Sequence, residues 1–304
     1  MGALTEGGSG SGIIPPNFEP APLSVQTSLD GEVNLPDPTM AHGTKKANDL
    51  AIENDNDAPY AYRDFDGELF VDGADYTDVD QNGLADCYLM TALASLAHTN
   101  PDILENMITD HGDGTYTVHF KGGFGDVRVD DDLVASPSGV SLYAGTGDRD
   151  NPELWVAIIE KAYAKASGGY DEIQFGRAYK VIAQLTGVDE KNDFIRDKGE
   201  EFDAQNLSDA IDEGRTVTVR SVEDDKKIEG YEVTADGIVS NHAYAVLDVR
   251  RNDAGEWEVV LYNPWAGSGT TSRGAHLGEF TMSWEAFISE ANFREVELMK
   301  SGLT

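Results

Sequence analysis

Apolar residues at helical spacing dominate the first half of the folded sequence. The stretch 87–97 is rich in strong helix formers and almost free of charge, so it predicts a buried helix that begins near Asp86. Apolar positions separated by four residues predict a long helix over 153–167, which Gly168 would end. Shorter helices are expected over 101–109, 176–185 and 207–213.

The hydrophobic pattern changes after Gly187, where apolar and polar residues alternate in a way that is typical of half-buried strands. A helix-rich half followed by a strand-rich half, without strand–helix alternation, predicts an α+β fold of two lobes. A cleft between two lobes is the first place to look for a functional site. Strands are expected over 116–120, 124–129, 216–220, 231–234, 243–251, 257–262 and 279–282.

The first 70 residues carry a different pattern. A Gly/Ser run at 7–12 and most of the 11 prolines fall there, and little of the segment is periodic. We expect residues 1–70 to be a Pro/Gly-rich acidic tail or linker that is largely disordered, with a propeptide or inhibitory arm as the alternative. A helical lobe over 71–187 and a β-rich lobe over 188–304 would follow.

The net charge of the chain limits the classes of molecule that it can bind. Fifty-six acidic and 22 basic residues give a formal net charge of −34, which disfavours nucleic acid because phosphate binding needs Lys and Arg. No apolar run reaches the roughly 18 residues of a membrane span. Without a visible leader, a cytoplasmic location is the default expectation, export by another route stays open, and a monomer is expected.

Cys87 is the single cysteine, so neither an internal disulfide nor a multi-cysteine zinc site can form. A lone cysteine is commonly a core residue. A thiol in the first turn of a helix can, however, have a lowered pKa and act as a nucleophile. Gln81 lies six residues upstream, near enough to donate an amide N–H to an oxyanion.

His242 and Asn263 follow far downstream, the first at the mouth of a predicted strand and the second at the end of one. Each is an ordinary turn residue when taken alone. Together with Cys87 they have the chain order Cys, His, Asn of papain-type proteases. An amide at Asn263 would orient the imidazole of His242.

Five blocks of the sequence, spread over about residues 65–285, resemble the calpain family of cysteine proteases. Residues 81–97 are similar to the family's nucleophile segment, Q-x-x-x-G-D-C-W followed by an Ala/Leu-rich helix. Residues 154–170 are similar to W-x-x-L-L-E-K-A-Y-A-K-x-x-G-x-Y. The blocks L-T-G, H-A-Y and N-P-W are matched, in the family's order, at 185–187, 242–244 and 263–265.

This resemblance implies a papain-like two-lobed fold and a thiol endopeptidase that hydrolyses proteins or peptides through an acyl-enzyme. It implies Cys87 as nucleophile, His242 as general base and acid, and Asn263 as the residue that orients the imidazole. Gln81 would stabilise the oxyanion together with the backbone N–H of Cys87. No cofactor is required for this chemistry.

Calcium as a regulator is also implied by the resemblance. Asp78 and Glu160 match acidic ligands of the family's first core calcium site, and carboxylate oxygens suit this ion. The alternative is that both are solvated acids of a very acidic protein. The sequence departs from the family at Ala85, Tyr88 and Ala266, where calpains have Gly, Trp and Gly.

Two other functions remain open at this point. A catalytically silent calpain-like module would bind protein partners, but such a module is expected to lose at least one of the four residues Cys87, His242, Asn263 and Gln81. A transglutaminase-type acyl transferase uses a similar thiol and histidine, usually with an aspartate as third member. Asn263 therefore favours the protease.

Overall fold

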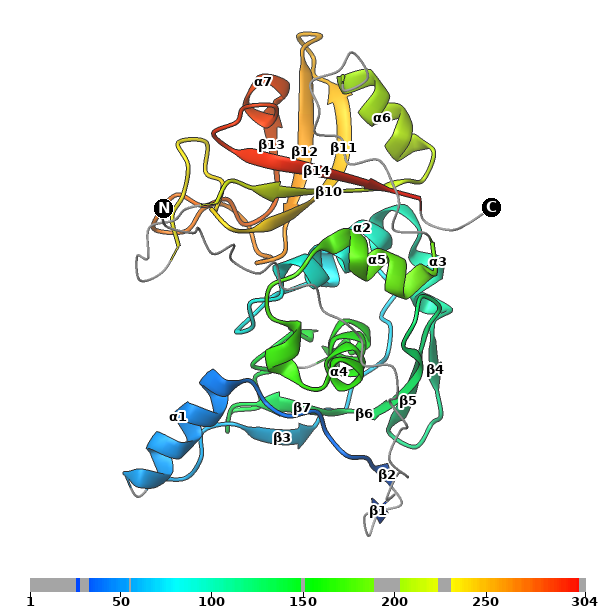
Figure 1. Cartoon of the computed structure of the whole chain (residues 1–304), viewed down its shortest axis with the longest axis vertical. Coiled ribbons are helices and arrows are strands. Elements are labelled where there is room, and N and C mark those ends of the chain that lie inside the picture. The colour runs from blue at the N-terminus through cyan, green and yellow to red at the C-terminus, as the bar shows by residue number, and fades with distance from the viewer. Residues whose placement is uncertain are drawn as a thin grey trace, which may run out of the picture.

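Two stacked lobes make up the computed structural model (Figure 1). Helices and short sheets from the first part of the chain form one lobe, and a five-stranded sheet with its helices forms the other. Buried apolar residues form two clusters, the larger in the first lobe and the smaller around the five-stranded sheet. The structure describes residues 26–27, 33–54, 56–148, 151–188, 203–223 and 231–300.

Helices α2 (Cys87–Thr99) and α4 (Trp155–Ser167) form the centre of the first lobe. Because α2 is apolar on every side, all its residues from Tyr88 to Ala97 are buried. Gly168 ends α4 with a φ of 102°, a left-handed conformation that glycine adopts without steric cost. The other helical segments of this lobe are α1 (His42–Glu53), η1 (Tyr76–Asp78), α3 (Pro101–Glu105), η2 (Tyr170–Ile173) and α5 (Ala178–Thr186).

Short antiparallel sheets flank these helices. One has three strands in the order β4 (Ile108–Asp110), β5 (Thr115–Phe120) and β6 (Gly125–Asp130). The others are pairs: β1 (Gln26–Thr27) with β2 (Val33–Asn34), β3 (Ala61–Asp64) with β7 (Asp132–Ala135), and β8 (Gly147–Asp148) with β9 (Asn151–Pro152).

The second lobe is built on one antiparallel sheet in the order β13-β12-β11-β10-β14. Alternate residues of its central strand face opposite sides, so Ala245 and Leu247 join the larger core near α2, whereas Tyr244 and Val246 join the smaller core. This strand therefore links the two lobes. The elements are α6 (Ala204–Asp212), β10 (Thr216–Ser221), β11 (Ala243–Arg251), β12 (Trp257–Asn263), β13 (Gly278–Ser283), α7 (Trp284–Phe287) and β14 (Phe293–Met299).

The predicted α+β fold, with a helical first lobe and an antiparallel second lobe, is confirmed. Two local predictions are wrong. The expected strand over 231–234 is a turn region with an isolated bridge from Val233 to Val239. The helix expected over 101–109 ends at Glu105, because the chain turns there into β4, which pairs with β5. No helix in the described part of the chain is both long and apolar enough to cross a membrane.

Residues 35–53 pack against the first lobe, although the sequence analysis expects a largely disordered tail over 1–70. Leu35 is 2% exposed, and its backbone N–H donates to the Asp130 carboxylate at 2.5 Å. The structure differs from the prediction here because partners distant in the sequence hold the segment, and such partners leave no periodic pattern within it. Residues 61–64 also contradict this prediction, because they form β3, which pairs with β7. Residues 1–25, 28–32 and 55 of the predicted tail lie outside the described residues.

Candidate active site

A cavity of about 660 Å³ lies between the two lobes and contains the predicted site residues Cys87, His242 and Gln81 on its wall. The first lobe contributes the loop before α2, the start of α2, and the loop after η2. The second lobe contributes the end of β10, the start of β11, and the turn after β12. Residues separated by more than 150 positions therefore share one pocket.

Cys87 is the first residue of α2, and its side chain is partly exposed to this cavity. Its sulfur accepts hydrogen bonds from the backbone N–H groups of Tyr88 in the first lobe and Ala243 in the second. Protein surrounds most of the thiol, and this burial raises the pKa of Cys87 to about 12, with a further contribution from the Asp86 carboxyl. Desolvation of the thiol therefore opposes the lowering of its pKa that the helix N-terminus favours.

His242 and Asn263 form a buried hydrogen-bonded pair. The ring Nε2 of His242 lies 2.8 Å from Asn263 Oδ1. The Asn263 amide is fixed in turn, since its Nδ2 donates to the carbonyl of His276 at 2.6 Å and its Oδ1 accepts from the Trp265 N–H at 3.0 Å. This network assigns the proton to Nε2, which leaves Nδ1 of His242 as the basic nitrogen. Burial lowers the pKa of His242 to about 4.

The backbone before β11 places the imidazole at the mouth of the strand. Asn241 has a φ of 55°, a left-handed conformation that asparagine tolerates better than most residues. The backbone N–H of His242 donates to Ser221 Oγ at 2.8 Å, so strand β10 also fixes the turn. The indole of Trp265 covers the imidazole, with 4.9 Å between ring centroids.

Gln81 lies on the cavity wall but turns its amide toward its own loop. Its Nε2 donates to the Leu84 carbonyl at 2.6 Å and to Asp86 Oδ1 at 3.2 Å, while its buried Oε1 has no hydrogen-bond partner. Its backbone N–H donates across the lobes to the Pro264 carbonyl at 2.6 Å. Gln81, the predicted oxyanion donor, thus lies on the cavity wall, but its amide N–H groups are engaged inside the loop.

Glu160, a predicted calcium ligand, lies on the buried side of α4 and is 2% exposed. Its Oε2 accepts from the Ala144 N–H at 3.1 Å, its Oε1 has no N–H donor, and the carboxyl of Asp86 is its nearest charged partner in the electrostatics. Burial, reinforced by Asp86, raises the pKa of Glu160 well above its usual range, and burial raises that of Asp86 to about 7. The structure does not bring Glu160 together with Asp78, and it leaves a calcium ion no access to Glu160.

Asp78 lies at the end of η1, and the carboxylate beside it belongs to Glu153 rather than to Glu160. Its Oδ2 accepts from the Trp155 ring Nε1–H at 3.1 Å and from the Asp75 N–H at 2.7 Å, and the Glu153 carboxyl lies beside it. Burial and the nearby charges of Asp78, Asp72 and Asp75 raise the pKa of Glu153 to about 7. Sequence reasoning missed Glu153; its place two residues before Trp155 was the available signal.

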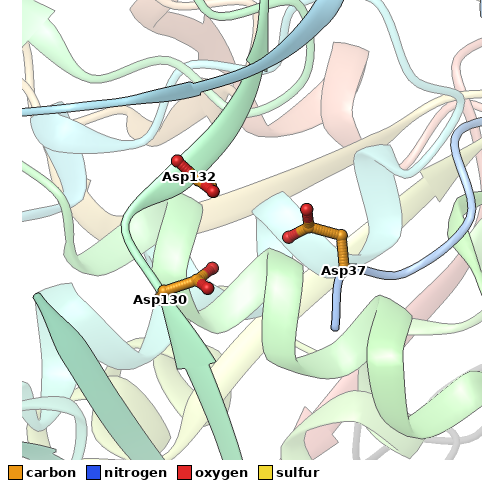
Figure 2. Close-up of side chains that lie close together, drawn as sticks. All are labelled: Asp37, Asp130 and Asp132. Atoms are coloured by element: carbon orange, nitrogen blue, oxygen red, sulfur yellow. The ribbon is translucent and has the colours of Figure 1, made fainter. Parts of the chain in front are cut away.

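Within the described residues, only Asp37, Asp130 and Asp132 bring three carboxylates within 4.8 Å of one another (Figure 2). The Lys161 ammonium already lies among them, 2.6 Å from Asp37 Oδ1, 2.5 Å from Asp130 Oδ1 and 2.5 Å from the Asp132 carbonyl. This cluster is therefore an internal ion-pair network. It ties the segment around Asp37 to β6, β7 and α4.

Comparison with known proteins adds the family relationship. The pattern described as "Calpain family cysteine protease" matches residues 59–286. The chain is 34% identical over 218 residues to the calpain-type cysteine protease DEK1 of Arabidopsis thaliana, a match covering 65% of this chain and 9% of that protein. It is 29% identical over 263 residues to Calpain-9 of Rattus norvegicus, covering 76% of this chain and 37% of that protein. The chain thus spans well under half the length of these relatives.

Proposed function

Because the chain belongs to the calpain family of cysteine proteases, we propose that it is a thiol endopeptidase whose catalytic residues are Cys87, His242 and Asn263. One observation carries the proposal. The Cys87 sulfur accepts a hydrogen bond from the residue that follows His242, and the far side of that imidazole is held by Asn263 at 2.8 Å. Cys87 and His242, suited to the roles of nucleophile and base, thus line one cavity, and Asn263 is buried behind the imidazole.

This geometry indicates which nitrogen of His242 accepts the thiol proton. With Nε2 of His242 bonded to Asn263, Nδ1 takes the thiol proton as the Cys87 sulfur attacks a peptide carbonyl. The tetrahedral intermediate collapses when the imidazolium returns that proton to the leaving amine, which gives an acyl-enzyme. Water then loses a proton to His242 and attacks the thioester, and the thiol is regenerated.

The negative charge that develops on the attacked carbonyl oxygen has to be stabilised by hydrogen-bond donors. The backbone N–H of Cys87 is one, since the first N–H groups of a helix have no partner within the helix. The Gln81 amide is the second once it releases one of its loop partners, Leu84 or Asp86. Substrate binding therefore has to reorient the Gln81 side chain.

We also propose calcium as a regulator, with Asp78 and Glu153 as its acidic ligands in place of Asp78 and Glu160. The fit is chemical: two carboxylates lie side by side in a partly exposed position, and their mutual repulsion would be relieved by a divalent cation. Glu160 does not fit, because it is buried beside the Asp86 carboxyl.

A protease assay tests the proposed function. The full chain should cleave a casein-like substrate, and Cys87→Ser should abolish cleavage with an unchanged far-UV circular dichroism spectrum. Equal rates for both proteins would remove the assignment, and an inactive but folded wild-type chain would favour the silent protein-binding module.

Calcium titration of the same assay tests the metal ligands. Asp78→Asn and Glu153→Gln should each raise the calcium concentration for half-maximal activity about tenfold, because affinity depends on the number of ligand charges. Glu160→Gln is the matched control and should leave the calcium response unchanged. Activity that a chelator does not reduce would contradict calcium control.

A further inference from the structure

Three buried oxygens without a hydrogen-bond donor lie in the first lobe, near the loop that leads to Cys87. One belongs to Gln81, which lines the cavity, one to Asp86 at the N-cap of α2 and one to Glu160 in α4, and each residue is less than a tenth exposed. The chemistry derived above does not use the two carboxyl oxygens among them. The atoms are Gln81 Oε1, Asp86 Oδ2 and Glu160 Oε1.

A proton is the simplest partner for the two carboxyl oxygens. The carboxyls of Asp86 and Glu160 interact with each other, and one buried oxygen of each has no N–H donor. A proton held between these two groups would supply the missing hydrogen bond. Within the described residues, no lysine or arginine contributes to the electrostatics of either group. Two uncompensated charges at this depth would be very costly, so the pair holds one proton and carries a single negative charge.

The surroundings place that proton on Glu160. Asp86 accepts from the Gln81 amide at 3.2 Å and stands at the N-terminus of α2, where backbone N–H groups favour an anion. Glu160 has one N–H donor, that of Ala144 at 3.1 Å. The tyrosines nearest to Glu160 (Tyr62, Tyr143 and Tyr170) have raised pKa values and are neutral, so they supply no competing charge.

We propose that Glu160 and Asp86 are positioning residues: protonated Glu160 donates to Asp86, and the Asp86 carboxylate anchors the Gln81 amide beside Cys87. The anchor holds one amide N–H of Gln81, so that the N–H bonded to the Leu84 carbonyl is the one that turns to the oxygen of an attacked carbonyl. This inference rests on the proposed function, because it concerns the second oxyanion donor of that reaction.

Variants at Glu160 separate positioning from packing. In Glu160→Gln the amide N–H replaces the carboxylic O–H as donor to Asp86, so kcat should stay within about threefold of wild type. In Glu160→Leu the donor is lost, and kcat should fall about tenfold with little change in KM. Gln81→Ala, which removes the oxyanion donor itself, should lower kcat about a hundredfold.

Two further readouts would not respond to a merely structural role. Binding of a peptide aldehyde, which forms a tetrahedral adduct with an oxyanion, should weaken in Glu160→Leu in proportion to kcat. Alkylation of Cys87 by iodoacetamide creates no oxyanion and should keep its rate. The double variant Gln81→Ala/Glu160→Leu should be no slower than Gln81→Ala, because both changes remove the same contribution, that of the Gln81 amide to oxyanion stabilisation.

Additive losses in the double variant, or equal losses in alkylation and turnover, would overturn the inference. If Glu160→Leu fails to fold, Asp86→Asn provides the same comparison, since its neutral oxygen is a weaker acceptor; it should lower kcat and aldehyde affinity together.

Infrared spectroscopy tests the proton independently of turnover. The infrared difference spectrum between wild type and Glu160→Gln at pH 7 should show the carbonyl band of one protonated carboxyl. The absence of this band would overturn the inference even for an active enzyme. An inactive wild-type chain that shows this band would instead refute the proposed function.

Discussion

Two groups of buried carboxylates in the first lobe are neutralised in different ways. Asp37 and Asp130 meet the ammonium of Lys161, which is 1% exposed. Asp86 and Glu160 meet each other, and a shared proton replaces the cation. The ion pair joins a distant segment to the lobe, whereas the protonated pair lies beside the nucleophile.

The difference teaches how one residue type acquires two roles. A lysine among the carboxylates gives a permanent charge balance, which suits attachment. A proton gives a hydrogen bond of defined direction without introducing a cation. A cation near Asp86 would also compete with Gln81 for its carboxylate. The type of neutralising group therefore agrees with what each region has to do.

The largest effect is expected when the lysine is removed. Lys161→Met leaves the buried Asp130 carboxylate without its cation, which should lower the free energy of unfolding by about 3–5 kcal/mol. Urea denaturation measures the loss. Lys165→Met, one turn further along α4, is the matched control and should cost much less, since Lys165 bonds a backbone carbonyl at 2.9 Å. Equal losses would contradict a special role for the ion pair.

A smaller effect is expected from pH acting on the protonated pair. Burial and the neighbouring Asp86 raise the pKa of Glu160 well above its usual range, so the folded state holds a proton that the unfolded chain has released. Stability linked to this proton is therefore complete below the unfolded pKa of about 4 and declines as the pH rises toward the pKa of the folded state.

Glu160→Gln should flatten this decline, because its amide cannot ionise and Asp86 then gains a permanent donor. The measurement is the difference in free energy of unfolding between the variant and wild type from pH 4 to pH 8, expected to grow by about 1–3 kcal/mol in favour of the variant. A difference that does not vary with pH would show that the pair does not hold a proton.

The smallest effect is expected at the edge of the ion-pair network. Asp37 is partly exposed, and Asp37→Asn keeps an oxygen acceptor for Lys161 while Asp130 supplies the remaining charge. The free energy of unfolding should fall by about 1 kcal/mol, measured by thermal denaturation. Asp66→Asn, at an exposed position, is the control and should be neutral; an equal change in both would argue that Asp37 does not hold the segment.

Much of the fold follows from local patterns. The uncharged apolar run predicts α2, the i, i+4 spacing and Gly168 predict α4, and alternation predicts four of the five strands in the large sheet. Strand β14 and helix α1 escaped prediction. Residues 296–299 of β14, Glu297 among them, are all buried, so the strand shows no strict alternation. Helix α1 has Thr44 as its buried residue, so its position depends on contacts outside the helix.

The same division holds at the candidate site. The order Cys, His, Asn along the chain and the family resemblance predict that Cys87, His242 and Asn263 lie close together; Cys87 and His242 line one cavity, and Asn263 is buried beside His242. Which glutamate faces Asp78 could not be predicted. Glu153 and Glu160 lie on the same short stretch, and their surroundings depend on how α4 packs against η1 and α2.

By itself, the amino-acid order determined the elements, their burial and the residues able to do thiol chemistry, because periodicity and residue type act locally along the chain. Only the tertiary structure decided the protonation of Cys87, the pairing of Asp86 with Glu160 and the placement of Lys161. The free energy of a charge depends on the water removed from it and on its distance from other charges. Both quantities exist only after distant segments have packed together.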